Sequence, residues 1–192
     1  MYGDLTLICG PMFSGKTTEL LKRILWEKNG LKRKIAVYKT SFDDRYAHEE
    51  VMNHDGLQAK AISIKEWGDI EEGVETVFFD EVQFFDQPQF KGDLISIVQD
   101  LLSRGINVVG AGLDMDASGS PFLITAQLLA MADEVKKLRS HCAICGQPAT
   151  KSYRKIENLS VIQLGGDDIY EPRCTTHWAE GREQEDLFKK QA

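Results

Sequence analysis

The chain has 192 residues and a net charge of −7, with 42% hydrophobic and 28% charged residues. This composition excludes a disordered chain, and the negative charge argues against a protein whose main task is to bind polyanions. A chain of this length buries roughly 70% of its unfolded surface, which is enough for a hydrophobic core. No apolar run is long enough to span a membrane, and the first residues carry neither a basic stretch nor a cleavage site. We therefore expect a cytoplasmic protein with no membrane partner and no secretory signal.

The first half of the chain alternates short apolar runs with amphipathic stretches. Residues 5–9 and 34–39 are apolar runs that predict buried strands. Leucine and isoleucine recur at helical spacing across residues 17–28, which predicts a helix. Residues 41–58 are polar and acidic and predict a long loop, which a short strand follows at residues 61–64.

The same alternation continues in the second half. Strands are predicted at residues 75–80, 106–111 and 135–138, and helices at residues 93–103 and 125–132. Because strands alternate with helices and the connections are too long for hairpins, the sequence predicts βαβ units and a parallel sheet.

A glycine-rich turn joins the first predicted strand to the first predicted helix. It fits the pattern G-x-x-x-x-G-K-[ST] in full, as Gly10-Pro11-Met12-Phe13-Ser14-Gly15-Lys16-Thr17. Glycines allow the backbone N–H groups of such a turn to converge on phosphate oxygens. Lys16 would reach the β- and γ-phosphates, and the Thr17 hydroxyl would ligate Mg²⁺. The alternative, a glycine turn with a coincidental lysine, does not account for the strand before it and the helix after it.

Two carboxylates follow the strand predicted at residues 75–80. Asp80 is the candidate for the magnesium shell, because the acid at this strand end holds the metal in P-loop proteins. Glu81 faces another way, since side chains alternate along a strand, and it could accept a proton from an attacking hydroxyl or water. The alternative is a polar strand end at an ordinary turn.

Three of the four cysteines have the spacing of metal ligands. Cys142-x-x-Cys145 is followed, after 28 residues, by Cys174-x-x-His177. Two chelating pairs predict one structural, tetrahedral Cys₃His zinc site with no open position. A disulfide and a redox-active pair are the alternatives, and a redox pair would leave Cys174 and His177 unexplained. Cys9 lies in the first predicted strand and is interpreted as a core thiol.

The βαβ pattern ends near residue 139, which predicts a domain boundary. Residues 1–138 are predicted to form a P-loop nucleotide-binding α/β domain. Residues 139–192 contain the zinc ligands, strand-like runs at 151–155 and 160–164, and a tail from residue 179 that reads as a charged helix or a frayed end.

Taken together, these motifs resemble thymidine kinases of the cellular (type II) class from residue 3 to about residue 178. The motifs that carry the resemblance are the phosphate loop, Asp43-Asp44-Arg45-Tyr46, Asp80-Glu81-Val82-Gln83-Phe84-Phe85, Pro121-Phe122, and the two zinc-ligand pairs. The resemblance implies a P-loop RecA-like parallel sheet with helices on both faces, plus a small zinc-bearing lasso domain. It also implies a homotetramer that is inhibited by the triphosphate end product, while the negative net charge leads us to expect no nucleic-acid partner.

The resemblance further implies transfer of the γ-phosphate of Mg-ATP to the 5′-hydroxyl of thymidine, and of deoxyuridine, with Glu81 as the catalytic base. Thr17 and Asp80 match the magnesium environment. The other expected ATP contacts are Gln83, Asp43, Arg45 and the remaining loop residues Gly10, Pro11, Met12, Phe13, Ser14, Gly15 and Lys16. The expected nucleoside contacts are Met12, Phe122, Tyr170, and the lasso residues Val161, Ile162, Gln163, Leu164 and Gly165.

The sequence departs from the family's pattern in three places. Residues 116–120 replace a stretch that usually contains a Phe-Arg-like pair, Val82 replaces a smaller residue, and residues 171–173 are atypical of the lasso. Two other functions compete with the kinase. A P-loop ATPase acting on nucleic acid would use the basic residues around the first zinc pair, namely Lys136, Lys137, Arg139, Lys151, Arg154 and Lys155. A non-catalytic nucleotide-binding regulator would have no use for Glu81.

Overall fold

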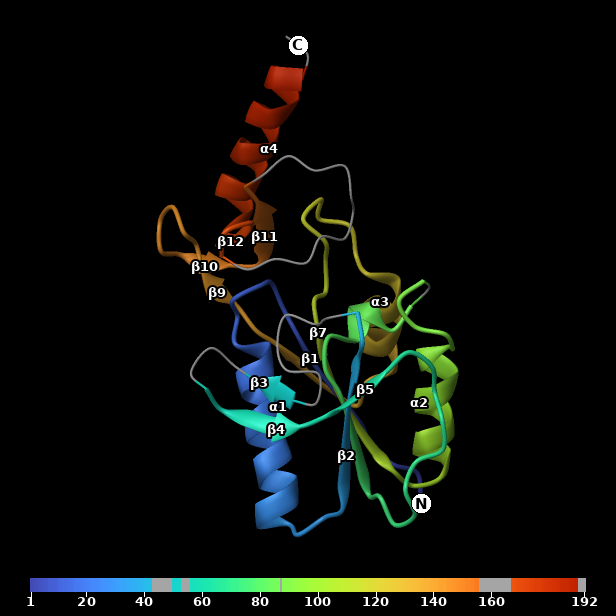
Figure 1. Ribbon diagram of the computed structural model, residues 1–192. Helices are drawn as coiled ribbons and strands as arrows, with labels where there is room; N and C mark the ends of the chain where they lie inside the picture. The colour runs from blue at the N-terminus through green and yellow to red at the C-terminus, as the bar shows by residue number, and fades with distance from the viewer. Residues whose placement is uncertain (43–49, 53–55, 87, 156–166, 190–192) are drawn as a thin grey trace.

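The computed structural model describes residues 1–42, 50–52, 56–86, 88–155 and 167–189. A six-stranded sheet with the order β5-β2-β6-β7-β1-β8 forms the centre of the described part (Figure 1). All of its strand pairs are parallel. Its strands are β1 (Leu5–Cys9), β2 (Ile35–Thr40), β5 (Ile62–Ile64), β6 (Thr76–Phe79), β7 (Asn107–Gly112) and β8 (Glu134–Lys137). The predicted α/β fold with a parallel sheet is confirmed.

Helices cover both faces of this sheet. Helix α1 (Lys16–Leu25) packs its buried residues into one apolar cluster, while α2 (Leu94–Ser103) and α3 (Leu123–Met131) pack into another (Figure 1). Because side chains alternate along a strand, a single strand can contribute residues to both clusters. Val77 and Phe79 of β6 belong to the cluster with α2 and α3, and Phe78 belongs to the cluster with α1. Asp93 caps α2, because its carboxylate accepts a hydrogen bond from the Ile95 amide at 3.0 Å.

The strand order decides where the site can form. Strand β7 lies between β1, which leads into the phosphate loop, and β6, which leads into Asp80 and Glu81. Because the strands are parallel, their carboxyl ends meet at one edge of the sheet. The phosphate loop, the acid pair and the residues that follow β7 therefore share that edge.

The predicted loop at residues 41–58 is partly wrong. Strand β3 (Glu50–Met52) pairs antiparallel with β4 (Gln58–Lys60). Val51, which is buried, packs into the cluster that contains α1. A single buried valine among polar residues gives no alternating pattern, so the strand had no sequence signal. The first helix is also shorter than predicted, because a π-helical segment (Trp26–Gly30) follows α1. A 3₁₀ helix (Val82–Phe84) follows the acid pair.

The chain beyond β8 forms two further two-stranded sheets and one helix. These elements are β9 (Ser140–His141), β10 (Pro148–Ala149), β11 (Lys151–Arg154), β12 (Tyr170–Arg173) and α4 (Thr175–Lys189). The strand predicted at residues 151–155 and the helical tail are present, while residues 160–164 lie outside the described residues. Among the described helices, none has the length and apolar character needed to cross a membrane.

Candidate functional site

The phosphate loop joins β1 to α1 in a conformation that needs its glycines. Gly10 and Gly15 have φ values of 148° and 82°. A Cβ atom on Gly10 would lie 2.5 Å from the Leu138 carbonyl oxygen, so no other residue fits there. Lys16 is 8% exposed, and its ammonium donates a hydrogen bond to the Pro11 carbonyl oxygen at 2.8 Å. The loop therefore holds its lysine inside the turn that it forms.

The charge of Lys16 depends on carboxylates from neighbouring strands. Burial lowers the pKa of Lys16 from its ordinary value, and the carboxylates of Glu81, Asp80 and Asp114 oppose that shift. These acids follow β6 and β7, and β7 is the strand between β6 and β1 in the order of the sheet. The structure thus brings Asp80 and Glu81 into the field of the phosphate-loop lysine.

Glu81 adopts a left-handed backbone conformation, with φ 53° and ψ 51°, at the start of the 3₁₀ helix. Non-glycine residues in this region are strained, and such strain is concentrated at functional sites. The Gln83 side-chain amide donates a hydrogen bond to the Glu81 carboxylate at 2.5 Å and accepts one from the Leu113 amide at 2.9 Å. Gln83 therefore fixes the Glu81 carboxylate relative to the end of β7.

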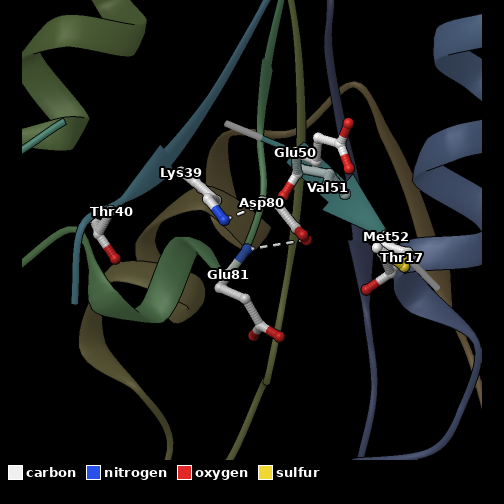
Figure 2. Close-up of a pocket in the computed structure, with 8 residues that line it drawn as sticks. All are labelled: Thr17, Lys39, Thr40, Glu50, Val51, Met52, Asp80 and Glu81. Atoms are coloured by element: carbon white, nitrogen blue, oxygen red, sulfur yellow. Dashed lines mark hydrogen bonds between the residues drawn. The ribbon is translucent and has the colours of Figure 1, made fainter. Parts of the chain in front are cut away.

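A pocket next to the acid pair is lined by side chains from several elements. Figure 2 shows its lining residues, which are Thr17, Lys39, Thr40, Glu50, Val51, Met52, Asp80 and Glu81. Lys39, at the end of β2, donates a hydrogen bond to the Glu50 carbonyl oxygen at 3.0 Å. The buried Thr40 hydroxyl has no hydrogen-bond partner among the described residues. Hydroxyl and carboxylate oxygens are the ligands that Mg²⁺ prefers, so the lining of this pocket fits a magnesium-bound phosphate.

Sequence reasoning missed Lys39, Thr40 and Asp114. Asp114 follows β7 and is almost fully buried, and its carboxylate forms an ion pair with Lys137 at 2.9 Å. The Asp114 carboxylate raises the pKa of Lys137, because it accepts a hydrogen bond from the Lys137 ammonium. All three residues lie at or just past the carboxyl ends of parallel strands, where ligand sites gather, and this position is the signal that could have found them.

The nucleoside residues expected from the resemblance are only partly described. The Phe122 amide donates a hydrogen bond to the Asp114 carbonyl oxygen at 3.1 Å, which places Phe122 beside the phosphate site. The Met12 amide donates to the Ser152 hydroxyl at 3.0 Å, and the buried Tyr170 ring lies 5.7 Å from the Arg154 guanidinium. The expected contacts Asp43, Arg45, Val161, Ile162, Gln163, Leu164 and Gly165 lie outside the described residues.

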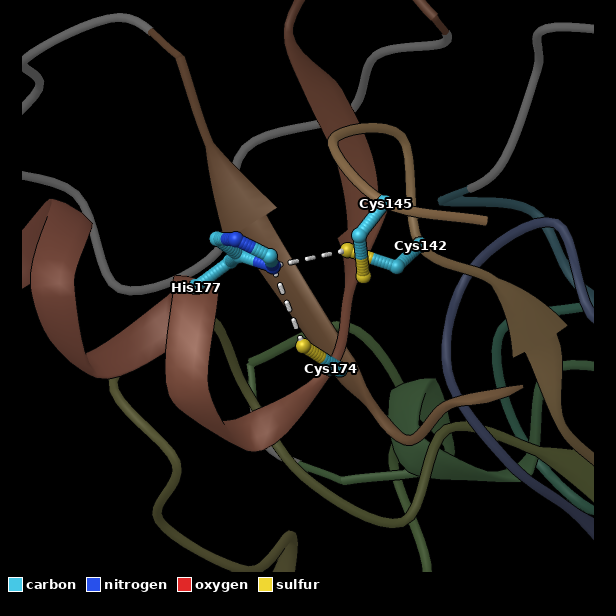
Figure 3. Close-up of side chains that lie close together, drawn as sticks. All are labelled: Cys142, Cys145, Cys174 and His177. Carbon is cyan, nitrogen blue, oxygen red and sulfur yellow. Dashed lines mark hydrogen bonds between the residues drawn. The ribbon is translucent and has the colours of Figure 1, made fainter. Parts of the chain in front are cut away.

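The four expected zinc ligands lie together, although 28 residues separate the two pairs. Figure 3 shows Cys142, Cys145, Cys174 and His177 converging, and their ligand atoms all lie within 4.8 Å of one another. His177 Nδ1 is 3.2 Å from Cys174 Sγ and 3.6 Å from Cys142 Sγ. Tetrahedral zinc with bonds of about 2.0–2.3 Å requires separations of roughly 3.5–3.8 Å, so the cluster could hold zinc.

The cysteines of the cluster form no disulfide, since all four cysteines of the chain are free. Burial raises the pKa of the Cys142 thiol, but hydrogen bonds from the backbone N–H groups of Cys174, Cys145 and Ile144 outweigh this and lower the pKa to about 6. A thiolate is the form that binds a metal. Gly146, with φ 72°, closes the turn by donating its amide hydrogen to the Cys142 carbonyl oxygen at 2.8 Å. The predicted ligand turn is therefore present.

The chain was compared with models of known protein families. The model described as thymidine kinase matches residues 3–178, which is most of the chain. The match spans the phosphate loop, the acid pair, Phe122 and all four ligands of the Cys₃His cluster.

Proposed function

Because the chain belongs to the thymidine kinase family, a family of nucleoside phosphotransferases, we propose that it transfers the γ-phosphate of ATP to the 5′-hydroxyl of thymidine, and of deoxyuridine. One observation carries the proposal beyond family membership. Thr17 of the phosphate loop and the acid pair Asp80-Glu81 line one pocket, and the two carboxylates oppose the lowering of the Lys16 pKa by burial. Phosphoryl transfer requires this combination of phosphate binding, charge neutralisation and a carboxylate near the reacting oxygen.

ATP would lie along the phosphate loop. The N–H groups of Gly10, Met12, Phe13, Ser14 and Gly15 would surround its phosphates together with Lys16, while Pro11 sets the turn. Thr17 and Asp80 would hold Mg²⁺, which neutralises phosphate charge when bound. Lys39 and Thr40 extend the polar lining of the adjacent pocket, and Asp43, Arg45 and Gln83 complete the proposed ATP-binding set.

Glu81 would accept the proton of the attacking 5′-hydroxyl. Glu81 is one of the residues that line the pocket shown in Figure 2, and Gln83 orients its carboxylate through the hydrogen bond at 2.5 Å. A base held by a second side chain needs little rearrangement during the reaction. The backbone strain at Glu81 supports this role, since a purely structural glutamate would gain nothing from a left-handed conformation.

The nucleoside would lie next to Met12, Phe122 and Tyr170. An aromatic ring can pack on the face of a pyrimidine, and the hydrogen bond between the Phe122 amide and the Asp114 carbonyl oxygen keeps Phe122 close to the phosphate site. Backbone groups of residues 161–165 would bind the base in the proposed lasso.

The Cys₃His cluster would hold a structural zinc ion. Its ligands flank the proposed lasso, two on each side, so the metal would pin both ends of that segment. We also propose the division into residues 1–138 and 139–192, a cytoplasmic location, a homotetramer and inhibition by the triphosphate. The last two rest on the family resemblance alone.

A nucleic-acid ATPase is supported less well. Four of the basic side chains that would serve it are engaged within the chain. Lys136 pairs with Glu19 at 2.6 Å, Lys137 pairs with Asp114 at 2.9 Å, and the cations of Lys151 and Arg154 lie over aromatic rings. Filter binding at ~150 mM salt tests this alternative, because binding driven by phosphate contacts would appear there and weaken steeply as salt rises.

The proposed reaction is tested by ADP release over a panel of nucleosides with Mg-ATP. We expect activity with thymidine and deoxyuridine, and a loss of ~10²–10⁴-fold in the Glu81→Gln variant with unchanged ATP affinity. Glu72→Gln, which changes an exposed glutamate, is the matched control and should keep full activity. Full activity of Glu81→Gln would overturn the role of the base. No activity of the unmodified protein with either nucleoside would overturn the function.

A further inference from the structure

The segment between β7 and α3 forms a closed hairpin that spans residues 115–121. Met115 and Pro121 form an isolated antiparallel bridge at its base. The Asp116 amide donates a hydrogen bond to the Ser120 carbonyl oxygen at 2.9 Å, and the Ser120 amide donates to the Asp116 carboxylate at 2.9 Å. One end of the hairpin follows Asp114 and the other precedes Phe122. Its position therefore bears directly on Phe122.

Helix α4 forms hydrogen bonds with the tip of this hairpin. The Trp178 indole N–H donates a hydrogen bond to the Ala117 carbonyl oxygen at 3.2 Å, and Arg182 donates to the Ser118 carbonyl oxygen at 2.5 Å. The Arg182 guanidinium also lies 5.0 Å from the centre of the indole ring. Figure 1 shows α4 beginning beside β12, far along the chain from the hairpin that it contacts.

Two further contacts fix the position of the Trp178 indole relative to the hairpin. The Lys151 ammonium lies 5.2 Å from the Trp178 ring and 3.2 Å from the Met115 sulfur, so it bridges the indole and the base of the hairpin. Gly119, with φ +84°, lets the tip approach, because a Cβ atom there would lie 2.9 Å from the Trp178 ring. Trp178 therefore contacts Ala117 and Gly119, two small residues at the tip of the hairpin.

We propose that Trp178 is a positioning residue for the nucleoside site: with Arg182 it holds the tip of the 115–121 hairpin and so fixes the place of Phe122. The proposal rests on the proposed function, in which Phe122 packs on the pyrimidine. Trp178 follows His177 directly in the first turns of α4, so it also links the Cys₃His cluster to the nucleoside site. Neither ATP binding at the phosphate loop nor the Glu81 base depends on this contact.

The first test compares Trp178→Ala with the unmodified protein. We expect the KM for thymidine to rise about tenfold, since a hydrogen bond and two cation–π contacts are lost, while the KM for ATP changes less than about twofold. Trp178→Phe keeps a ring over Gly119 and should show a smaller rise, about threefold, because only the indole N–H is lost. Trp26→Ala is the matched control: Trp26 is 60% exposed, lies past the far end of α1, and should leave both KM values unchanged.

The second test asks whether the hairpin and the indole act as one unit. Gly119→Ala places a methyl group against the Trp178 ring and should raise the thymidine KM. In the Trp178→Ala background that methyl group has room, so the same change should add less than it does alone. Strictly additive effects, or an unchanged thymidine KM in Trp178→Ala, would overturn the proposal.

Hydrogen exchange separates this proposal from the proposed function. The amides of residues 116–120 should exchange faster in Trp178→Ala than in the unmodified protein, while bound zinc, measured per chain, stays the same. If the unmodified protein phosphorylates no nucleoside, the proposed function fails and the exchange rates still test the contact. Equal exchange rates at residues 116–120 in the two proteins would show that Trp178 does not hold the hairpin.

Discussion

The α/β core and the part of the chain from β9 onward, called here the Cys/His part, are stabilised by different means. The core has an apolar cluster on each face of its sheet, with large side chains such as Phe78, Phe79 and Leu101 fully buried. In the Cys/His part, the buried hydrophobic residues among those described are Cys142, Ala149 and Tyr170. Apolar burial therefore explains the first region and leaves the second without a sufficient core.

The Cys/His part has a cluster of possible metal ligands and cation–aromatic contacts instead. The Arg173 guanidinium lies 3.4 Å from the centre of the Tyr153 ring and donates a hydrogen bond to the His177 carbonyl oxygen at 3.1 Å. Gly181 allows this packing, because a Cβ atom there would lie 2.3 Å from Arg173. These contacts all gather around the four metal ligands. We therefore expect this part of the chain to depend on the zinc ion proposed for the cluster, as small domains without a core do.

Metal removal should destabilise the Cys/His part and leave the α/β core folded. Of the changes predicted here, it is expected to have the largest effect on stability. Structural zinc contributes about 10–16 kcal/mol to the folding of small metal-dependent domains. A chelator should therefore abolish the hydrogen-exchange protection of β9, β10, β11 and β12, while β1, β6 and β7 keep theirs. Hydrogen exchange followed by mass spectrometry measures both regions in one experiment.

A matched variant controls for the loss of a thiol. Cys174→Ser should reproduce the effect of the chelator, whereas Cys9→Ala, which removes the one thiol outside the cluster, should leave the protection of β9–β12 intact. Unchanged protection after chelation would show that the Cys/His part is stable without metal.

A cavity in the α/β core should have the next largest effect on stability. It should lower the stability of the core and not that of the Cys/His part. Leu101 is fully buried on α2, so Leu101→Ala should lower the free energy of unfolding by about 2–5 kcal/mol. Leu31→Ala, which truncates a leucine that is 46% exposed, should cost less than about 0.5 kcal/mol. Urea unfolding followed by circular dichroism gives both values. Equal losses in the two variants would contradict the assignment of stability to the apolar clusters.

The sequence predicted those features that depend on local patterns. Apolar runs located the strands of the sheet, helical spacing located α1 and α2, and ligand spacing identified Cys142, Cys145, Cys174 and His177. Each of these patterns is short and is imposed by the period of an element or the reach of a ligand pair. The parallel sheet followed because its connections were too long for hairpins.

The features that the sequence did not predict depend on segments far apart in the chain. Asp114 gains its role from Lys137 and from the phosphate loop, and Trp178 gains its role from a carbonyl oxygen 61 residues away. Strand β3 is fixed by packing on α1 and not by any alternation of its own. Such contacts are properties of the folded arrangement. No local pattern indicates the Trp178 contact or strand β3, and for Asp114 the sequence offers only its position just past a predicted strand.

The contacts between the Cys/His part and the phosphate loop should have the smallest effect when they are removed. Two hydroxyl groups of the Cys/His part contact the phosphate loop: Ser152 accepts a hydrogen bond from the Met12 amide at 3.0 Å, and Ser140 donates to the Phe13 carbonyl oxygen at 3.0 Å. Ser152→Ala leaves the Met12 N–H without this partner, which costs about 1–3 kcal/mol where the group is buried. Because Met12 is part of the turn that would bind phosphate, the KM for ATP should rise about three- to tenfold.

The substrate whose KM changes distinguishes the contact made by Ser152 from the contact made by Trp178. Ser152→Ala should act mainly on ATP and Trp178→Ala mainly on the nucleoside, although both side chains belong to the Cys/His part. Ser103→Ala, which removes a hydroxyl from the exposed end of α2, should change neither KM. If Ser152→Ala leaves the KM for ATP unchanged, the Cys/His part would act on the nucleoside alone. If ATP binding weakens as expected, one metal-dependent region contributes to both substrate sites, and loss of its metal would impair both.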